Sequence, residues 1–218
     1  MDNDVTVEPE NDADQSAQAD IEQLKAATNT KSLKLQAGYH LVGLVSAVAM
    51  WGAADTWVLT SELTIAALFS VIASIVFGVA MAHIIHEWSH FLGAVIAEAN
   101  YTVKKKPAFL FFDFDYVGNT QRQFLWMSSG GFAGNCVLIA IVWLAIPLDS
   151  AGRGMLLATV IGMAVYVAVL EGPVIRRTRA GEDSLTVLTE HFGQGDILFN
   201  RATQWAVGVG LVCWLLVS

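Results

Sequence analysis

Apolar stretches about as long as a lipid bilayer is thick dominate the chain after its first 35 residues. An α-helix rises 1.5 Å per residue, so a hydrocarbon core of roughly 30 Å takes about twenty residues. Five apolar stretches come near or exceed this length, at residues 37–57, 63–97, 127–147, 154–175 and 202–218. The pattern predicts an all-α polytopic membrane protein of about five transmembrane helices, the second of which is long enough to tilt or bend.

Two segments between the spans carry patterns of their own. Residues 112–116 alternate aromatic and acidic side chains, which is the period-two pattern of a strand, and residues 121–124 offer a return strand after a turn. We therefore expect a small β-hairpin within residues 108–124, at the membrane edge. Within residues 183–199, apolar positions recur with helical spacing, which predicts a short helix lying on the membrane surface.

The beginning of the chain differs from the rest in composition. Eight of the twenty acidic residues lie before residue 23, and apolar residues are few there. Such a segment cannot form a core, so we expect an acidic, disordered arm at residues 1–35 and a transmembrane domain at residues 36–218. Without the arm the chain is roughly neutral, which gives no case for nucleic-acid binding. The whole chain is 55% hydrophobic and 15% charged, which argues against a water-soluble globule.

The basic residues predict the orientation of the chain in the membrane. Eleven of the twelve Lys and Arg residues fall before the first span, between the second and third, or after the fourth, whereas only Arg153 falls in the opposite loops. Cytoplasmic segments of membrane proteins are enriched in Lys and Arg. We therefore expect a multi-pass cell membrane protein whose amino terminus, residues 98–126 and residues 176–201 face the cytoplasm.

One short motif in the second span carries candidate chemistry, His86-Glu87-Trp88-Ser89-His90. Histidines four residues apart share one helical face and can bind one zinc ion, and a carboxylate beside the ion can take a proton from water bound to it. A random chain of this composition would contain about 0.005 strings of the form HExxH. Ionisable groups in a span also need a partner, which a metal ion supplies. A hydrogen-bonded cluster without metal is the alternative.

The motif in its helical context resembles the site-2 proteases, a family of intramembrane zinc metalloproteases. Residues 86–94 (HEWSHFLGA) match the first motif of that family, and residues 131–135 (GFAGN) stand where the family has Gly-Pro-x-x-Asn, with Phe132 in place of proline. The resemblance covers residues 63–175. It implies a Zn²⁺ cofactor, a membrane-edge hairpin, and a transmembrane or membrane-anchored protein as substrate.

The resemblance also implies a third metal ligand, which the family takes from an aspartate in a later core helix. The family's pattern for this aspartate is absent here, and two acidic residues resemble its end, Asp149 and Glu171. The predicted topology puts Asp149 on the far side of the membrane and Glu171 on the cytoplasmic side, with the histidines. We therefore expect Glu171 to be the third ligand. The alternative for Glu171 is an ion pair with Arg176 or Arg177.

Two further residues are candidates for supporting roles. His83 lies on the same helical arc as the two motif histidines, so we expect it to line the pocket or to hydrogen-bond to a ligand. Asn135 stands beside glycines at 130, 131 and 134 and is a candidate for contacting the substrate or polarising its carbonyl. Helix packing through small residues explains the glycines equally well.

These observations together predict a zinc-dependent metalloendopeptidase that cuts a membrane-anchored protein substrate near the cytoplasmic face. His86, His90 and Glu171 would hold the ion, Glu87 would act as general base, and the hairpin edge would hold the substrate by strand addition. Two alternatives stay open. One is a non-catalytic zinc-binding adaptor or pseudoprotease that binds transmembrane segments, and the other is a metal-dependent hydrolase of a different substrate. Glu87 favours catalysis, because a structural metal site needs no general base.

Overall fold

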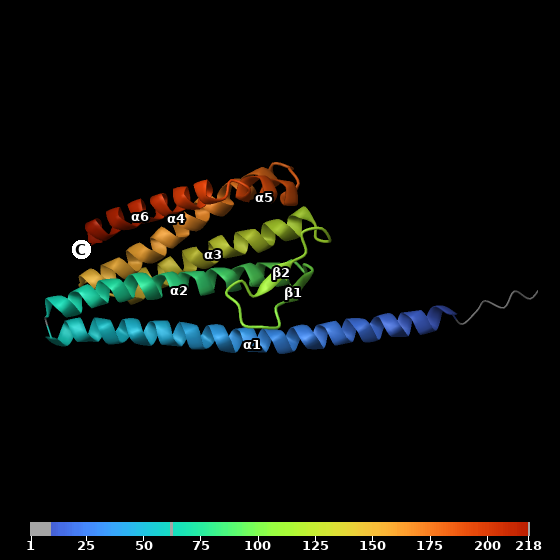
Figure 1. Cartoon of the computed structure of the whole chain (residues 1–218), viewed down its shortest axis with the longest axis horizontal. Coiled ribbons are helices and arrows are strands. Elements are labelled where there is room, and N and C mark those ends of the chain that lie inside the picture. The colour runs from blue at the N-terminus through green and yellow to red at the C-terminus, as the bar shows by residue number, and fades with distance from the viewer. Residues whose placement is uncertain (1–9, 62, 218) are drawn as a thin grey trace, which may run out of the picture.

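The computed structural model describes residues 10–61 and 63–217, and this part of the chain forms six helices and one two-stranded sheet. The long helices lie side by side, with the sheet and the short helix α5 together at one end of the bundle (Figure 1). The elements in chain order are α1 (Glu10–Ser61), α2 (Thr64–Ile96), β1 (Tyr101–Val103), β2 (Phe112–Phe114), α3 (Gln121–Ala145), α4 (Ala151–Arg179), α5 (Ser184–Phe192) and α6 (Asp196–Val217).

The fold is an all-α polytopic membrane fold, as the sequence predicts. Four helices in the described residues are long and apolar enough to cross a membrane: α1 from Thr28 onward, α2, α3 and α4. Large apolar side chains cover the outside of the bundle, among them Leu144 and Leu216, each about 80% exposed. The fifth predicted span lies on α6, which is not one of the four. Asn200, Arg201 and Gln204 lower the mean hydropathy of its first turns.

Helix α2 is the central element of the bundle, because it packs against α1, α3 and α4, while α6 packs along α4. The main apolar core lies where α1, α2, α3 and α4 meet and is built mostly from small and branched side chains such as Ala82, Leu138 and Leu156. A second cluster joins the sheet to the ends of α3, α4 and α5 through Phe114, Phe124 and other side chains. The apolar packing therefore holds the amino-terminal end of α3 and the carboxyl-terminal end of α4 next to the sheet.

Helices α2 and α3 approach each other closely through glycines. A Cβ atom at Gly93 would lie 2.5 Å from the carbonyl oxygen of Trp126, and one at Gly130 or Gly134 would overlap Ser89. No larger residue fits at these positions without moving a backbone. The sequence allowed either a packing role or a functional role for the glycines of α3, and the structure gives them a clear packing role. They bring α3 against the helical face that carries the HExxH motif.

The hairpin differs from its predicted form. Strand β2 falls within the predicted residues 112–116, but its antiparallel partner is β1, with Thr102 opposite Asp113. The predicted return strand, residues 121–124, is instead the first turn of α3. Thr120 caps this helix through a capping box with Gln123, which satisfies the free N–H groups of the first turn and makes the helix the better structure for these residues.

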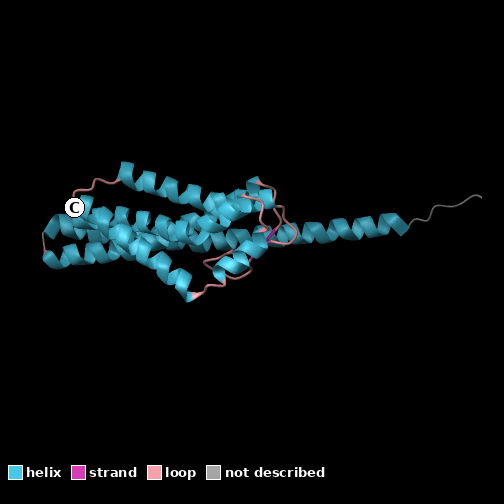
Figure 2. Cartoon of the chain, turned by 90° about the horizontal axis from the view of Figure 1, so that it is seen from above, coloured by secondary structure: helices cyan, strands magenta, loops and turns pink. Residues whose placement is uncertain are grey.

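The predicted disordered arm is helical in its described part, since α1 begins at Glu10, whereas residues 1–9 lie outside the described residues. This part of α1 extends past the rest of the molecule (Figures 1 and 2). Residues 10–35 lack the apolar surface for a core of their own, but they continue a transmembrane helix. Extending an existing helix adds one hydrogen bond per residue and avoids the cost of nucleation.

The predicted surface helix within residues 183–199 is present as α5, and the end of that range already belongs to α6. Asp183 caps α5, and hydrogen bonds from the backbone N–H and the hydroxyl of Thr186 hold the pKa of Asp183 below its ordinary value. At the end of α4, Arg177 binds both Glu182 and Glu190, and its guanidinium lowers the pKa of the exposed Glu182 carboxyl. These pairs fix α5 beside the end of α4.

Helix α1 is attached to the rest of the bundle by polar contacts at two levels. At the level of the sheet, the fully buried side chain of Gln36 donates to the carbonyl oxygens of Lys104 (2.8 Å) and Lys106 (2.6 Å) and accepts from the N–H of Ala108 (3.1 Å). It therefore satisfies three backbone groups of the β1–β2 loop, which would otherwise lack partners.

At the opposite end of the bundle, Arg153 of α4 forms a nearly buried ion pair with Asp55 of α1 (2.8 Å). Nearby, the indole N–H of Trp51 donates to the Ser74 hydroxyl, which donates to the carbonyl oxygen of Gly152. These bonds connect α1, α2 and α4. Because ionic and polar groups within apolar bundles are stable only when they are paired, they fix the relative positions of these three helices.

The contacts of Gln36 predict that Gln36→Leu will loosen the β1–β2 loop. Leucine has nearly the same volume but removes the partner of two partly buried carbonyls and one partly buried N–H, and the loss of such a partner costs up to about 1–3 kcal/mol for a buried group. Hydrogen–deuterium exchange at Ala108 should accelerate by at least about tenfold. The matched control is Gln204→Leu, which changes an exposed glutamine of α6. Equal exchange at Ala108 in the parent and in Gln36→Leu would contradict the role of Gln36.

Candidate metal centre

The two motif histidines lie one helical turn apart on the face of α2 that meets α3. They are almost fully buried, with 5% of His86 and 8% of His90 exposed. Gly131 of α3 lies directly against them, since a Cβ atom there would overlap His86 and would lie 2.5 Å from Cε1 of His90. The imidazoles therefore occupy the space that this glycine leaves, and α3 holds them in one orientation.

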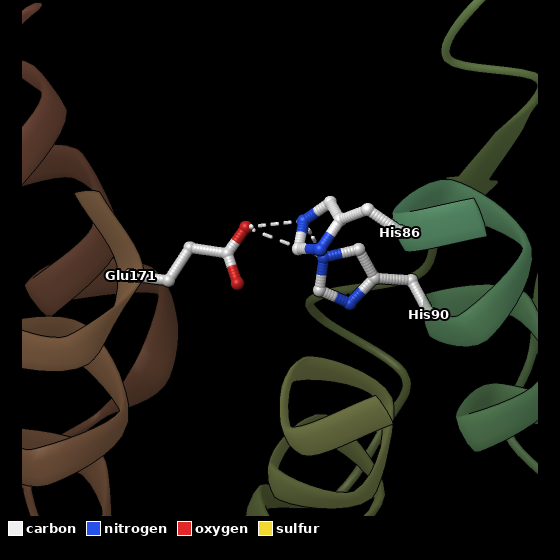
Figure 3. Close-up of side chains that lie close together, drawn as sticks. All are labelled: His86, His90 and Glu171. Atoms are coloured by element: carbon white, nitrogen blue, oxygen red, sulfur yellow. Dashed lines mark hydrogen bonds and ion pairs between the residues drawn. The ribbon is translucent and has the colours of Figure 1, made fainter. Parts of the chain in front are cut away.

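Glu171 of α4 completes the cluster from the opposite side (Figure 3). Its Oε1 atom lies 3.1 Å from Nε2 of His86 and 3.2 Å from Nε2 of His90, and the two Nε2 atoms are 2.8 Å apart. Three potential ligand atoms from two helices thus face one another at one point. The structure brings together the three residues that the sequence predicts as metal ligands.

The spacing of these atoms suits a small metal ion. Around zinc bound tetrahedrally at 2.0–2.1 Å, neighbouring ligand atoms lie about 3.3 Å apart, which two of the three distances observed here approach and the 2.8 Å between the imidazoles falls below. The second oxygen of Glu171, Oε2, is buried and has no hydrogen-bond partner in the described part of the chain. An unpaired carboxylate oxygen in an apolar bundle is costly, and a cation beside it removes that cost. Two imidazoles and a carboxylate are a donor set that zinc uses in catalytic sites.

The other ring nitrogens of the histidines are oriented by α3. Nδ1 of His90 donates to the carbonyl oxygen of Met127 at 2.9 Å, which leaves the lone pair of Nε2 directed at the cluster. Nδ1 of His86 lies 3.3 Å from the amide of the buried Asn135. With a metal on Nε2, Nδ1 carries the proton, and the amide of Asn135 can present its oxygen to accept it. Asn135 thus contacts a histidine of the cluster, whereas the role expected from the sequence was contact with the substrate or its carbonyl.

A cavity of about 290 Å³ opens beside the cluster. Glu87, His90 and Glu171 line it together with Asp113 and Tyr116 from the β2 region, and α5 closes one wall with apolar side chains. Burial raises the pKa of the Tyr116 phenol, and the negative charges of Glu171 and Glu87 raise it further. Tyr116 is therefore a neutral hydrogen-bond donor at physiological pH. The lining is mostly apolar, but the partly exposed carboxylates of Glu87 and Glu171 give the site access to water, which a hydrolytic reaction requires.

Two other predicted candidates lie elsewhere. His83 does not line the cavity, and its ring packs against Phe109 of the β1–β2 loop, with 5.5 Å between centroids. The helical rise puts His83 about 10 Å from His90 along the axis, against about 6 Å between His86 and His90, so the three imidazoles cannot all meet at one point. Asp149 lies near the opposite end of the bundle, where it pairs with Arg153 at 2.7 Å.

The alternative ion pairs predicted for Glu171 are not formed. Arg177 binds Glu182 and Glu190, and Arg176 has no ion pair with any residue whose side chain is described. Sequence reasoning missed the Met127 carbonyl and Tyr116. The alternating pattern that includes Tyr116 was recognised as a strand signal only. Backbone carbonyls carry no residue-type signal, so Met127 could not have been found from the sequence.

Comparison with family models, with curated proteins and with solved structures finds no match for this chain. The geometry of the site therefore carries the functional assignment.

The cluster predicts one metal ion per chain, which depends on Glu171. Glu171→Gln should lower the zinc content of the purified protein to a small fraction of the parental value, because two remaining histidines hold zinc poorly. His86→Ala should have the same effect. Zinc is measured by inductively coupled plasma mass spectrometry after dialysis.

The matched controls are two substitutions of acidic residues outside the ligand set. Asp149→Asn and Glu87→Gln should both keep the parental zinc content. A loss of metal in Asp149→Asn with retention in Glu171→Gln would show that the ligand set is wrong.

Proposed function

We propose that this protein is a zinc-dependent metalloendopeptidase that hydrolyses a peptide bond of a membrane-anchored protein. The observation that carries this proposal is the convergence of Nε2 of His86, Nε2 of His90 and Oε1 of Glu171 beside a cavity that Glu87 also lines. Zinc suits this donor set, and three protein ligands leave room for a substrate or a water molecule. The carboxylate of Glu87, which is not one of the three ligands, distinguishes this arrangement from a closed structural metal site.

Glu87 is the general base of the proposed reaction. When bound, zinc lowers the pKa of a water molecule and polarises the scissile carbonyl. The Glu87 carboxylate then takes a proton from the water molecule as the water oxygen adds to the carbonyl carbon. Glu87 returns that proton to the leaving amide nitrogen as the C–N bond breaks. Tyr116, a neutral donor on the wall of the cavity, is placed to hydrogen-bond to the substrate.

The free edge of strand β2 supports an extended substrate. Lys104 donates its N–H to the carbonyl of Phe111, and Thr102 lies opposite Asp113, so the backbone groups of residues 111 and 113 face β1. The backbone groups of Phe112 and Phe114 alternate with these and face away from β1. Both residues line the cavity beside Glu87, so a substrate strand added there would lie against the site.

The opposite edge of the sheet is closed. The N–H of Val103 faces away from β2 and donates to Oδ1 of Asn29 on α1, at 3.2 Å. Strand addition in this hairpin is thus directed to the edge beside the metal centre. The same contact places Asn29, near the start of the long apolar part of α1, at the level of the sheet.

We also propose that the metal centre lies near the cytoplasmic face of the cell membrane, with the amino terminus inside. The basic residues support this orientation, and in the structure the sheet, α5 and the basic carboxyl end of α4 lie at one end of the bundle. The far end holds Asp149 and the short connection before α4.

The proposed orientation predicts a labelling pattern. Cysteines introduced at Asn119 and Gly195, in a background without Cys136 and Cys213, should resist an impermeant thiol reagent in intact cells and react after permeabilisation. A cysteine at Ser150 should react in intact cells. The reverse pattern would place the metal centre on the outer side.

The proposed mechanism predicts that Glu87→Gln keeps its zinc and loses activity. Glutamine preserves size but cannot accept the proton, and removal of a general base costs about 10²–10⁴ in rate. Parent and variant are reconstituted in liposomes with a library of peptides fused to a transmembrane helix, and the products are identified by mass spectrometry. Asp149→Asn, at an exposed position near the opposite end of the bundle, is the control and should cleave at the parental rate.

The same measurement separates the enzyme from a zinc-binding adaptor. An adaptor would show no difference between the parent and Glu87→Gln in any cleavage product. Equal product yields from these two proteins would therefore contradict the assignment of Glu87 as base.

A further inference from the structure

A second cavity lies between α3 and α4 at the same end of the bundle. It shares one lining residue, Ile175, with the cavity beside the candidate metal centre. It has a volume of about 350 Å³ and is lined by six residues. Helix α3 contributes Ser129 and Phe132, and α4 contributes Gly172, Ile175, Arg176 and Arg179. Phe132 stands where the resemblance leads one to expect proline, and here its ring forms part of the cavity wall.

The two arginines of this cavity differ from Arg177, which lies between them in the sequence, in their lack of an ion-pair partner. Arg177 is neutralised by Glu182 and Glu190, whereas Arg176 and Arg179 are exposed and form no ion pair with any residue from 28 to 217 that the structure describes. Arg122 is exposed and equally unpaired, and it lies two helical turns before Ser129 on the same face of α3. Two cations without an ion-pair partner among the described residues thus line the cavity, and a third lies two turns away on the same face of α3.

The position of the cavity determines which anion can reach it. Its lining changes from apolar at Phe132 and Ile175 to cationic at Arg176 and Arg179, which end the span of α4. Gly172 adds depth, since a Cβ atom there would have nothing within 4 Å. A ligand that fits must therefore carry a negative charge and an apolar chain side by side, at the level where the hydrocarbon core meets the aqueous phase.

We propose that this cavity binds an anionic phospholipid, with the phosphate on Arg176 and Arg179 and the upper part of an acyl chain against Phe132 and Ile175. One guanidinium group can bind two phosphate oxygens at once, and basic pockets between transmembrane helices are suited to anionic headgroups. The site is independent of the metal and of peptide hydrolysis.

Native mass spectrometry of the full chain in detergent tests this proposal. The protein is incubated with dioleoylphosphatidylglycerol or dioleoylphosphatidylcholine, and the retained lipid is counted. The parent should retain the anionic lipid at concentrations at which the zwitterionic lipid is lost. The double variant Arg176→Gln/Arg179→Gln should weaken this retention by about 10- to 30-fold.

Two further variants distinguish a shaped site from general charge attraction. Gly172→Leu keeps all arginines but fills the cavity, and it should reduce retention of the anionic lipid as the double variant does. Lys105→Gln/Lys106→Gln removes two exposed cations from the β1–β2 loop and should leave retention unchanged. The helical circular dichroism and the unfolding midpoint of each variant are compared with those of the parent.

Three outcomes would overturn the proposal. The first is equal retention of both lipids by the parent. The second is equal loss of the anionic lipid in Lys105→Gln/Lys106→Gln and in Arg176→Gln/Arg179→Gln, which would indicate diffuse charge attraction. The third is binding of inorganic phosphate as tightly as the lipid, because the apolar part of the cavity would then contribute nothing.

Discussion

The burial of two imidazoles and a carboxylate inside an apolar helix bundle is the constraint on which the rest of the structure depends. Groups of this kind are stable in a membrane only when each polar atom has a partner. Met127 and Asn135 supply partners for the outer ring nitrogens, and the inner nitrogens converge with Oε1 of Glu171. These contacts require α2, α3 and α4 to meet at one level, and the glycines of α3 let them do so.

Local sequence patterns made much of the fold and most of the candidate metal centre predictable. The four spans follow from the lengths of the apolar stretches, and the shared face of His86 and His90 follows from helical spacing. The family resemblance implied a third, acidic ligand, and the predicted direction of each span favoured Glu171 over Asp149, because it put Glu171 at the level of the histidines. In each of these cases the deciding information lies within one helix or in the order of the helices.

Features that depend on competition between distant segments were not predictable. Residues 121–124 have a strand-like pattern, but the capping box at Thr120 favours the helix. His83 shares the arc of the ligands, yet Phe109 from the β1–β2 loop packs against it. The helical start of α1 reflects continuation of a span, which composition alone does not reveal. Each outcome is decided by a tertiary contact or by a helix end rather than by the local pattern.

The two attachment points of α1 restrict how the bundle can open. Gln36 and Asp55 are about 28 Å apart along the helix axis. Because α1 is held at both residues, it cannot pivot about either one. Separation of α1 from α2 would require both sets of polar contacts to break together. On the opposite flank, the described contacts between the sheet and α5 are apolar and tolerate sliding. We therefore expect the cavity to open first between the sheet and α5, while α5 stays paired with the end of α4 and α1 remains the fixed wall.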